Sequence, residues 1–217
     1  MTDKELFESL SYERKNAYLK MTEAEKKEMW EMSDSYRTFL DKGKTERECV
    51  REAVRMAQES GFVDIDLLDN LKAGDKVYKI NRNKNIFMAV IGSEDIRKGI
   101  NIAGAHIDSP RLDLKQNPLY ESMDMALLKT HYYGGIKKYQ WPTVPLAIHG
   151  VIYDTEGKQR EIVIGEEEND PVFVISDLLP HLAKDQMVKK MTEGIEGESL
   201  NVLIGGMPIE AEDVKET

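Results

Sequence analysis

The residues best suited to chemistry in this sequence are a histidine and an aspartate one residue apart, His106 and Asp108. They follow an apolar run at residues 100–105, which predicts a buried strand that ends where the histidine begins. Residues i and i+2 of an extended chain share a face, so the imidazole and the carboxylate can meet. A neutral imidazole binds zinc well, and a carboxylate on its other ring nitrogen fixes the tautomer. The pair therefore suits a zinc site in which Asp108 orients His106.

The same pair also has an ordinary structural explanation, because a histidine beside an aspartate is often only a hydrogen-bonded pair. Zinc sites take about three or four protein ligands. The other histidines, His131, His149 and His181, lack Cys or Glu partners at the spacing of a metal site. The sequence also contains no H-E-x-x-H, C-x-x-C, glycine-rich phosphate loop or G-x-S-x-G. Local spacing thus supplies half of a site and leaves both interpretations open.

The first part of the chain must provide the helices and strands that hold this segment. Apolar periodicity and two capping boxes, which begin at Thr22 and Thr45, predict helices from residue 3 to about residue 60. Residues 33–35 interrupt the pattern, and Gly61 is suited to end the last helix. Two strands then follow with a polar turn between them, and the second is apolar on both faces, which is typical of a central strand. These strands are expected at residues 76–80 and 86–91.

After Pro118 the sequence changes to short apolar runs separated by turn residues, which predicts a β-rich second domain. An acidic run at residues 166–170 is expected to be a solvated loop. Helices are expected to begin at residue 176 and at residue 207. The predicted strands are residues 125–133, 145–153 and 161–165.

Composition excludes several classes of partner. The chain has 217 residues and a formal charge of −10, which disfavours a nucleic acid or an anionic membrane. Its one cysteine, Cys49, cannot form an internal disulfide and is expected on a helix. The N-terminal residues lack the apolar core of a signal peptide, and no run approaches the ~18 apolar residues of a membrane span. We therefore expect a cytoplasmic protein with no nucleic-acid and no membrane partner.

Several longer motifs occur in one order around the His-x-Asp pair. Residues 104–118 contain His-x-Asp-Ser-Pro followed by Leu-x-Leu-Lys-x-Asn-Pro. Tyr-Gly-Gly begins at Tyr133, Trp141 comes next, and Leu-Leu-Pro-His-Leu occupies residues 178–182. In this order the motifs resemble the M18 family of zinc aminopeptidases, the aspartyl aminopeptidase family. The resemblance implies a peptidase that removes N-terminal residues, acidic ones in the family's usual preference, at a centre of two zinc ions. Residues 137–145 depart from the family's usual segment, so the acidic preference is not carried over.

The resemblance also implies roles for individual residues. His106 matches the family's first zinc ligand, and Asp108 matches the carboxylate that orients it. His181 matches a histidine on a helix of the family's inserted domain, which reaches a neighbouring subunit's active site and holds substrate or stabilises the tetrahedral intermediate. The alternative for His181 is a histidine of a helix surface or of the core. His131 and His149 are expected to be sheet residues, and the aromatic residues Tyr132, Tyr133 and Trp141 to lie in the core or in a subunit interface.

The resulting expectation is an α/β fold in two parts. Residues 1–118 would hold N-terminal helices and the first part of a catalytic α/β sheet domain, which is incomplete. Residues 119–217 would hold the first part of an inserted β-rich oligomerisation domain, so the chain looks truncated. The other zinc ligands and the glutamate base would lie beyond residue 217, and this chain alone is expected to be inactive and to retain zinc weakly. The expected partners are peptide substrates and further copies of the chain. The alternative function is a catalytically inactive oligomerisation or adaptor module that retains the fold.

Overall fold

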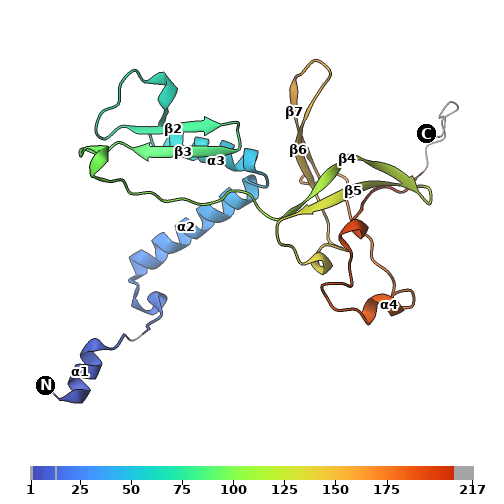
Figure 1. The fold of residues 1–217 in the computed structure, drawn as a ribbon, viewed down its shortest axis with the longest axis horizontal. Helices are drawn as coiled ribbons and strands as arrows, with labels where there is room; N and C mark the ends of the chain where they lie inside the picture. Colours follow the sequence, from blue (N-terminus) through green and yellow to red (C-terminus); the bar gives the residue numbers. More distant parts are fainter. Residues whose placement is uncertain (1, 13, 208–217) are drawn as a thin grey trace. The chain divides into compact units, whose positions relative to one another are not determined.

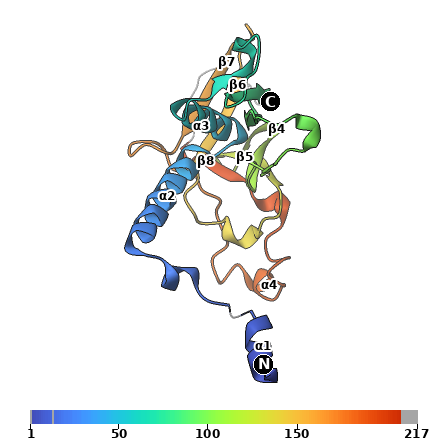
Figure 2. The ribbon, with the colours of Figure 1, turned by 90° about the vertical axis from the view of Figure 1, so that its left-hand side faces the viewer.

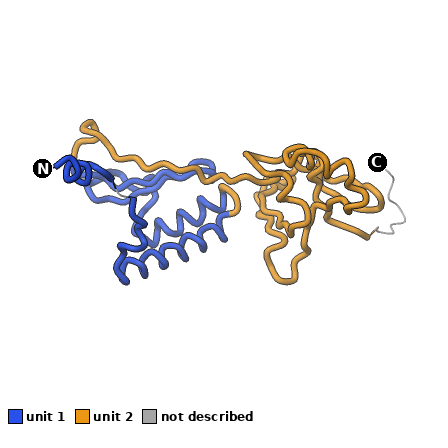
Figure 3. Tube along the Cα trace, turned by 90° about the horizontal axis from the view of Figure 1, so that it is seen from below, with its two compact units in different colours: residues 1–43, 47–93 blue, residues 44–46, 94–217 orange. Residues whose placement is uncertain are grey.

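The computed structural model describes residues 2–12 and 14–207, and the chain divides into two compact units (Figure 3). Unit 1 comprises residues 1–43 and 47–93, and unit 2 comprises residues 44–46 and 94–217. Both units contain helices and open sheets, which confirms the predicted mixed α/β class. The helix expected from residue 207 onward falls at residues 208–217 outside the described residues.

Unit 1 begins with the predicted helices (Figure 1), and Thr22 starts the longest of them with a complete capping box. Glu25 N donates to Thr22 Oγ1 over 3.3 Å, and Thr22 N donates to Glu25 Oε2 over 2.7 Å. The helix continues through Ser33 and Ser35, so the predicted interruption was wrong. Two serines cost a helix only a few tenths of a kcal/mol each, roughly, which the helix-forming residues around them offset. The helical elements are α1 (Asp3–Leu10), η1 (Ala17–Lys20), α2 (Glu23–Lys42) and α3 (Glu46–Glu59).

The end of α3 confirms the role predicted for Gly61. Gly61 has a φ of 81°, the left-handed conformation that glycine adopts without a steric cost. Its N–H donates to Gln58 O over 3.0 Å, and Phe62 N donates to Ala57 O over 2.9 Å, which is the Schellman pattern. Cys49 is buried on the same helix, as expected.

The sheet of unit 1 has the strand order β1-β2-β3, and α3 covers one of its faces (Figures 1 and 2). Gln58 Nε2 on α3 donates to Tyr78 Oη on β2 over 3.0 Å, and Tyr78 and Val77 are buried. The predicted hairpin is confirmed, because β2 and β3 pair antiparallel from Lys76↔Val90 to Asn81↔Asn85. The elements are β1 (Val63–Asp64), η2 (Ile65–Leu67), β2 (Lys76–Asn81) and β3 (Asn85–Val90).

Two expectations about buried strands were wrong. β3 lies at the edge of its sheet, β2 lies in the centre, and Phe87 and Val90 of β3 are exposed. Residues 100–105 form no strand, and Ile102 is exposed. An apolar run becomes a buried strand only where a neighbour pairs with its backbone and another layer covers its side chains. In residues 2–12 and 14–207 no strand pairs with residues 100–105.

Unit 2 has the β-rich character predicted for the second part of the chain. It contains a sheet of order β4-β5-β8 and a hairpin of β6 and β7. β4 passes through Pro118 without a break, so no structural division falls at the predicted boundary of residues 118 and 119. The β4–β5 register shifts between Leu114 and Leu119, and such an irregularity accommodates a proline inside a strand. The elements are η3 (Ile96–Lys98), β4 (Arg111–Ser122), β5 (Met125–Tyr133), η4 (Lys138–Gln140), β6 (Ile148–Tyr153), β7 (Gln159–Ile164), α4 (Lys184–Met187), η5 (Gly197–Ser199) and β8 (Val202–Gly205).

The core of unit 2 is built from distant parts of its sequence. Thr130 on β5 is buried, and its hydroxyl donates to the carbonyl of Leu200, which joins β5 to the segment before β8. Trp141 packs against this core, which confirms the expectation of a structural role. The buried members are Leu128, Phe173, Ile175, Leu200 and Val202.

The acidic run at residues 166–170 is an ordered turn, in which residues 166–169 are exposed and Asp170 is half-buried. Asp170 Oδ2 accepts backbone N–H groups from Gly165, Glu166 and Glu167 over 2.8, 3.2 and 3.2 Å. These hydrogen bonds lower the pKa of Asp170, and the bond from Gly165 has the largest effect, followed by the bond from Glu167. Across the helices of the described residues, none combines the length and the apolar character that crossing a bilayer requires.

Candidate metal and catalytic site

His106 and Asp108 lie in unit 2, in the irregular segment between η3 and β4. The prediction that their side chains meet is confirmed. His106 Nδ1 lies 2.8 Å from the backbone O of Asp108 and 3.1 Å from its Oδ1. Both partners are acceptors, so Nδ1 carries the proton, and in the neutral imidazole it is Nε2 that has the lone pair. Because the His106 side chain is 82% exposed, the imidazole is accessible and Nε2 is the ring nitrogen left to bind a metal.

Asp108 uses its second carboxylate oxygen to bind a tyrosine. Tyr133 Oη, at the end of β5, donates to Asp108 Oδ2 over 2.9 Å. The hydroxyl of Tyr133 lowers the pKa of Asp108, and the imidazole of His106 acts in the same direction. The carboxylate in turn raises the pKa of Tyr133. Asp108 is therefore an ionised acceptor near neutral pH and Tyr133 a neutral donor, which are the states that both hydrogen bonds need.

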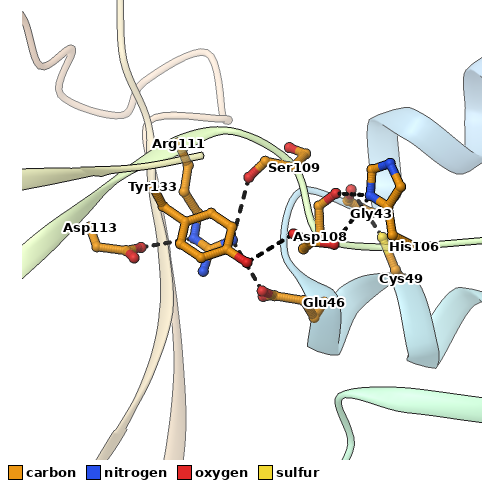
Figure 4. A network of polar contacts seen from close by, with 9 residues as sticks. All are labelled: Gly43, Glu46, Cys49, His106, Asp108, Ser109, Arg111, Asp113 and Tyr133. Carbon is orange, nitrogen blue, oxygen red and sulfur yellow. Dashed lines mark hydrogen bonds and ion pairs between the residues drawn. The ribbon is translucent and has the colours of Figure 1, made fainter. Parts of the chain in front are cut away.

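Arg111 connects this pair to the sheet of unit 2 (Figure 4). Its guanidinium lies over the Tyr133 ring, 4.3 Å from the centroid, in a cation–π contact. Arg111 Nε donates to Asp113 Oδ1 over 2.8 Å, and its NH1 lies 3.1 Å from Oε1 of Glu46, which also belongs to unit 2. The network thus runs from Glu46 and Asp113 through Arg111 and Tyr133 to Asp108 and His106.

Sequence reasoning missed Tyr133 and Arg111 as parts of this site. Tyr133 was expected in the core or in an interface, and Arg111 carried no expected role. The antiparallel pairing of β4 and β5 places Arg111 directly opposite Tyr133. The available signal was the arginine three residues after Asp108, but the register that brings the tyrosine to it depends on the whole hairpin.

His181 lies in no helix, although a helix that begins at residue 176 was predicted to contain it. It is exposed in a turn in which Leu182 N donates to Leu179 O over 2.9 Å and Ala183 N donates to Pro180 O over 3.3 Å. The helix expected from residue 176 was wrong, and α4 begins only at Lys184. Pro180 has no N–H, and it disfavours helical backbone at the residue before it. In the described part of the chain, the network around Asp108 does not extend to His181, whose catalytic role stays a prediction.

The two remaining histidines are sheet residues, as predicted. His131 on β5 stacks on Tyr132 with 5.5 Å between ring centroids. His149 on β6 has its Nε2 2.9 Å from Glu166 Oε1. Neither contact involves His106.

Among the described histidines, His106 is exposed and has its Nδ1 held by Asp108, an orientation that fits metal binding. Over residues 2–12 and 14–207, no group of three or more His, Cys, Asp and Glu side chains is arranged to hold an ion. Because a zinc site takes about three or four ligands, His106 with Asp108 can form part of such a site and cannot form it alone.

Comparison with known proteins identifies the family of the chain that carries His106 and Asp108. A family described as "Aminopeptidase I zinc metalloprotease (M18)" matches residues 39–217. The chain therefore belongs to the M18 family, as its motifs indicated.

Individual relatives agree with this assignment. A probable M18 family aminopeptidase 1 of Clostridium acetobutylicum is 52% identical over 208 residues, which are 94% of this chain and 45% of the relative. The crystal structure of an M18 aminopeptidase from Thermotoga maritima matches with a TM-score of 0.85 and 44% identity, and the match covers 94% of this chain and 44% of that one. The aminopeptidase I structure from Clostridium acetobutylicum gives a TM-score of 0.82 and 47% identity, over 95% and 46% of the two chains. The present chain thus spans less than half the length of these relatives.

Proposed function

We propose that this chain contributes the first zinc ligand to a zinc-dependent aminopeptidase that removes N-terminal residues from peptides. The observation that carries the proposal is the geometry of His106 in a chain of the M18 family. Its Nδ1 is held by Asp108, and the exposed ring leaves Nε2 as the nitrogen that can bind a metal. This is the arrangement in which a carboxylate fixes the tautomer of a metal-binding histidine.

Zinc, when bound, would polarise the scissile carbonyl and lower the pKa of a water molecule. In this chain His106 would hold the metal through Nε2, and Asp108 would keep the proton on Nδ1. On the family resemblance we propose two ions for the complete site, and a substrate-binding role for His181. The exposed position of His181 is compatible with a contact to substrate or to another subunit.

The test is a peptidase assay on the complete polypeptide that contains these residues, loaded with zinc or cobalt. We expect release of N-terminal residues from a peptide panel that varies the first residue among acidic, basic and apolar types. We expect activity to be lost after chelation and restored by the metal. For residues 1–217 alone we expect negligible activity and less than one equivalent of zinc after dialysis. Absence of release from every peptide would contradict the proposal and favour the catalytically inactive module.

We also propose that the protein is a homo-oligomer. Unit 2 exposes several large apolar side chains along residues 172–188, the segment that contains His181, and we infer that they form an apolar patch of the kind typical of protein interfaces. A more distant structure, 18% identical with a TM-score of 0.60, is that of a yeast dodecamer, and this similarity concerns the fold. The exposed side chains are Val172, Leu178, Leu179, Leu182, Met187 and Val188.

The mass of the complete polypeptide in solution checks this second proposal. We expect size-exclusion chromatography with light scattering to give a multiple of the chain mass. The double change Leu179→Glu and Leu182→Glu should lower that mass, because it places charges in the patch. The matched change Leu119→Glu alters an exposed leucine on β4 and should leave the mass unchanged. A monomer at every protein concentration tested would contradict the proposal.

A further inference from the structure

The orientation of the His106 ring depends on its hydrogen bonds to the backbone O and the carboxylate of Asp108, because the His106 backbone belongs to no helix or strand. Asp108, which orients the imidazole, lies in the same irregular segment. Its carboxylate has two oxygens with different partners: Oδ1 binds His106 Nδ1 at 3.1 Å, and Oδ2 binds Tyr133 Oη at 2.9 Å. The Tyr133 bond is therefore the contact that fixes the carboxylate on the side away from His106.

The hydroxyl of Tyr133 is held in place by the sheet behind it. Tyr133 is the last residue of β5 and pairs with Arg111, the first residue of β4. The Arg111 guanidinium covers the ring at 4.3 Å and is itself fixed by Asp113 at 2.8 Å and Glu46 at 3.1 Å (Figure 4). Two carboxylates on one guanidinium leave it little freedom to rotate. The ring therefore has a fixed position from which its hydroxyl reaches Asp108.

We propose that Tyr133 is a positioning residue that holds the Asp108 carboxylate in the rotamer that orients the His106 imidazole for metal binding. The proposal rests on the proposed function insofar as His106 is a zinc ligand. Without the hydroxyl, the carboxylate of Asp108 keeps one side-chain partner and can rotate away from Nδ1. Nδ1 would then keep the backbone O of Asp108 at 2.8 Å and lose the charged acceptor, so the bias that keeps the proton on Nδ1 would weaken. Partners of this outer kind typically change metal affinity by ~10–100-fold.

The test compares three variants of the complete polypeptide. Tyr133→Phe removes the hydroxyl and keeps the ring on Arg111, whereas Tyr133→Leu removes both. Tyr132→Phe is the matched control, because it removes a hydroxyl from the next residue of β5, whose side chain points to the other face. Two properties are measured: the tautomer of His106 in the metal-free protein from imidazole 15N chemical shifts, and the dissociation constant for cobalt. The thermal unfolding midpoint of each variant is recorded beside them.

We expect Tyr133→Phe to give a mixture of tautomers and ~10–100-fold weaker cobalt binding, with an unfolding midpoint close to that of the wild type. Tyr132→Phe should match the wild type in all three measurements, and Tyr133→Leu should show the same losses together with a lower midpoint. Wild-type tautomer and affinity in Tyr133→Phe would overturn the proposal. Equal losses in Tyr132→Phe would also overturn it.

The tautomer measurement separates this proposal from the proposed function. It uses metal-free protein and needs no peptidase activity. A tautomer mixture in Tyr133→Phe, in a protein that releases no N-terminal residue from any peptide, would support the positioning of His106 and contradict the peptidase. An unchanged tautomer in Tyr133→Phe, in a protein that is an active peptidase, would contradict the positioning role of Tyr133 and support the proposed function.

Discussion

Replacing His106 with alanine in the complete polypeptide should reduce aminopeptidase activity by more than about a hundredfold and remove one equivalent of bound metal. The expected loss exceeds the ~10–100-fold typical of residues that only support a ligand, because His106 would itself hold the metal through Nε2. The change should leave the fold intact, since the His106 side chain is exposed and lies outside helices and strands. Initial rates on a cleaved peptide and metal analysis after dialysis measure the two effects.

The matched control for this substitution is His131→Ala, which removes an exposed histidine from β5. We expect the control to keep the wild-type metal content and activity. If His106→Ala keeps both as well, His106 is not a ligand. The hydrogen bond to Asp108 would then be the ordinary structural pair that the local spacing alone also allows.

Replacing Leu200 with alanine should give the largest loss of stability, ~2–5 kcal/mol in the free energy of unfolding of unit 2. Leu200 is fully buried at 0% exposure and packs with Leu128, Phe173 and Ile175. Truncation removes buried methyl groups and leaves a cavity that the surrounding strands can fill only in part. Urea unfolding of residues 1–217, monitored by tryptophan fluorescence in a Trp30→Phe background, measures this free energy. Trp141 of unit 2 is then the one tryptophan of the chain, so the signal comes from unit 2.

Leu179→Ala is the control for the core substitution, because it makes the same chemical change at a side chain that is 59% exposed. We expect its free energy of unfolding to stay within ~0.5 kcal/mol of the wild type. Similar losses in Leu179→Ala and Leu200→Ala would show that the cluster around Leu200 is not the core that stabilises unit 2.

The helices were predictable because their signals are local. The capping box at Thr22 and the glycine at residue 61 act within a few residues, and both were found as expected. The interruption predicted near Ser33 failed because the weak preferences of two serines and an aspartate are offset along a helix of 20 residues. The strand predicted at residues 100–105 failed for the opposite reason. A strand needs a partner, and in the described residues none pairs with that segment.

The sequence by itself determined the family, the His-x-Asp pair and the contact within it. A spacing of one residue brings an imidazole and a carboxylate together over only a few bonds of chain. The tertiary structure decided what holds this pair. Tyr133 follows Asp108 by 25 positions, and only the pairing of β4 with β5 and the stacking on Arg111 bring its hydroxyl to the carboxylate. Strand register is set by all the residues of a hairpin together, so no single motif could reveal this contact.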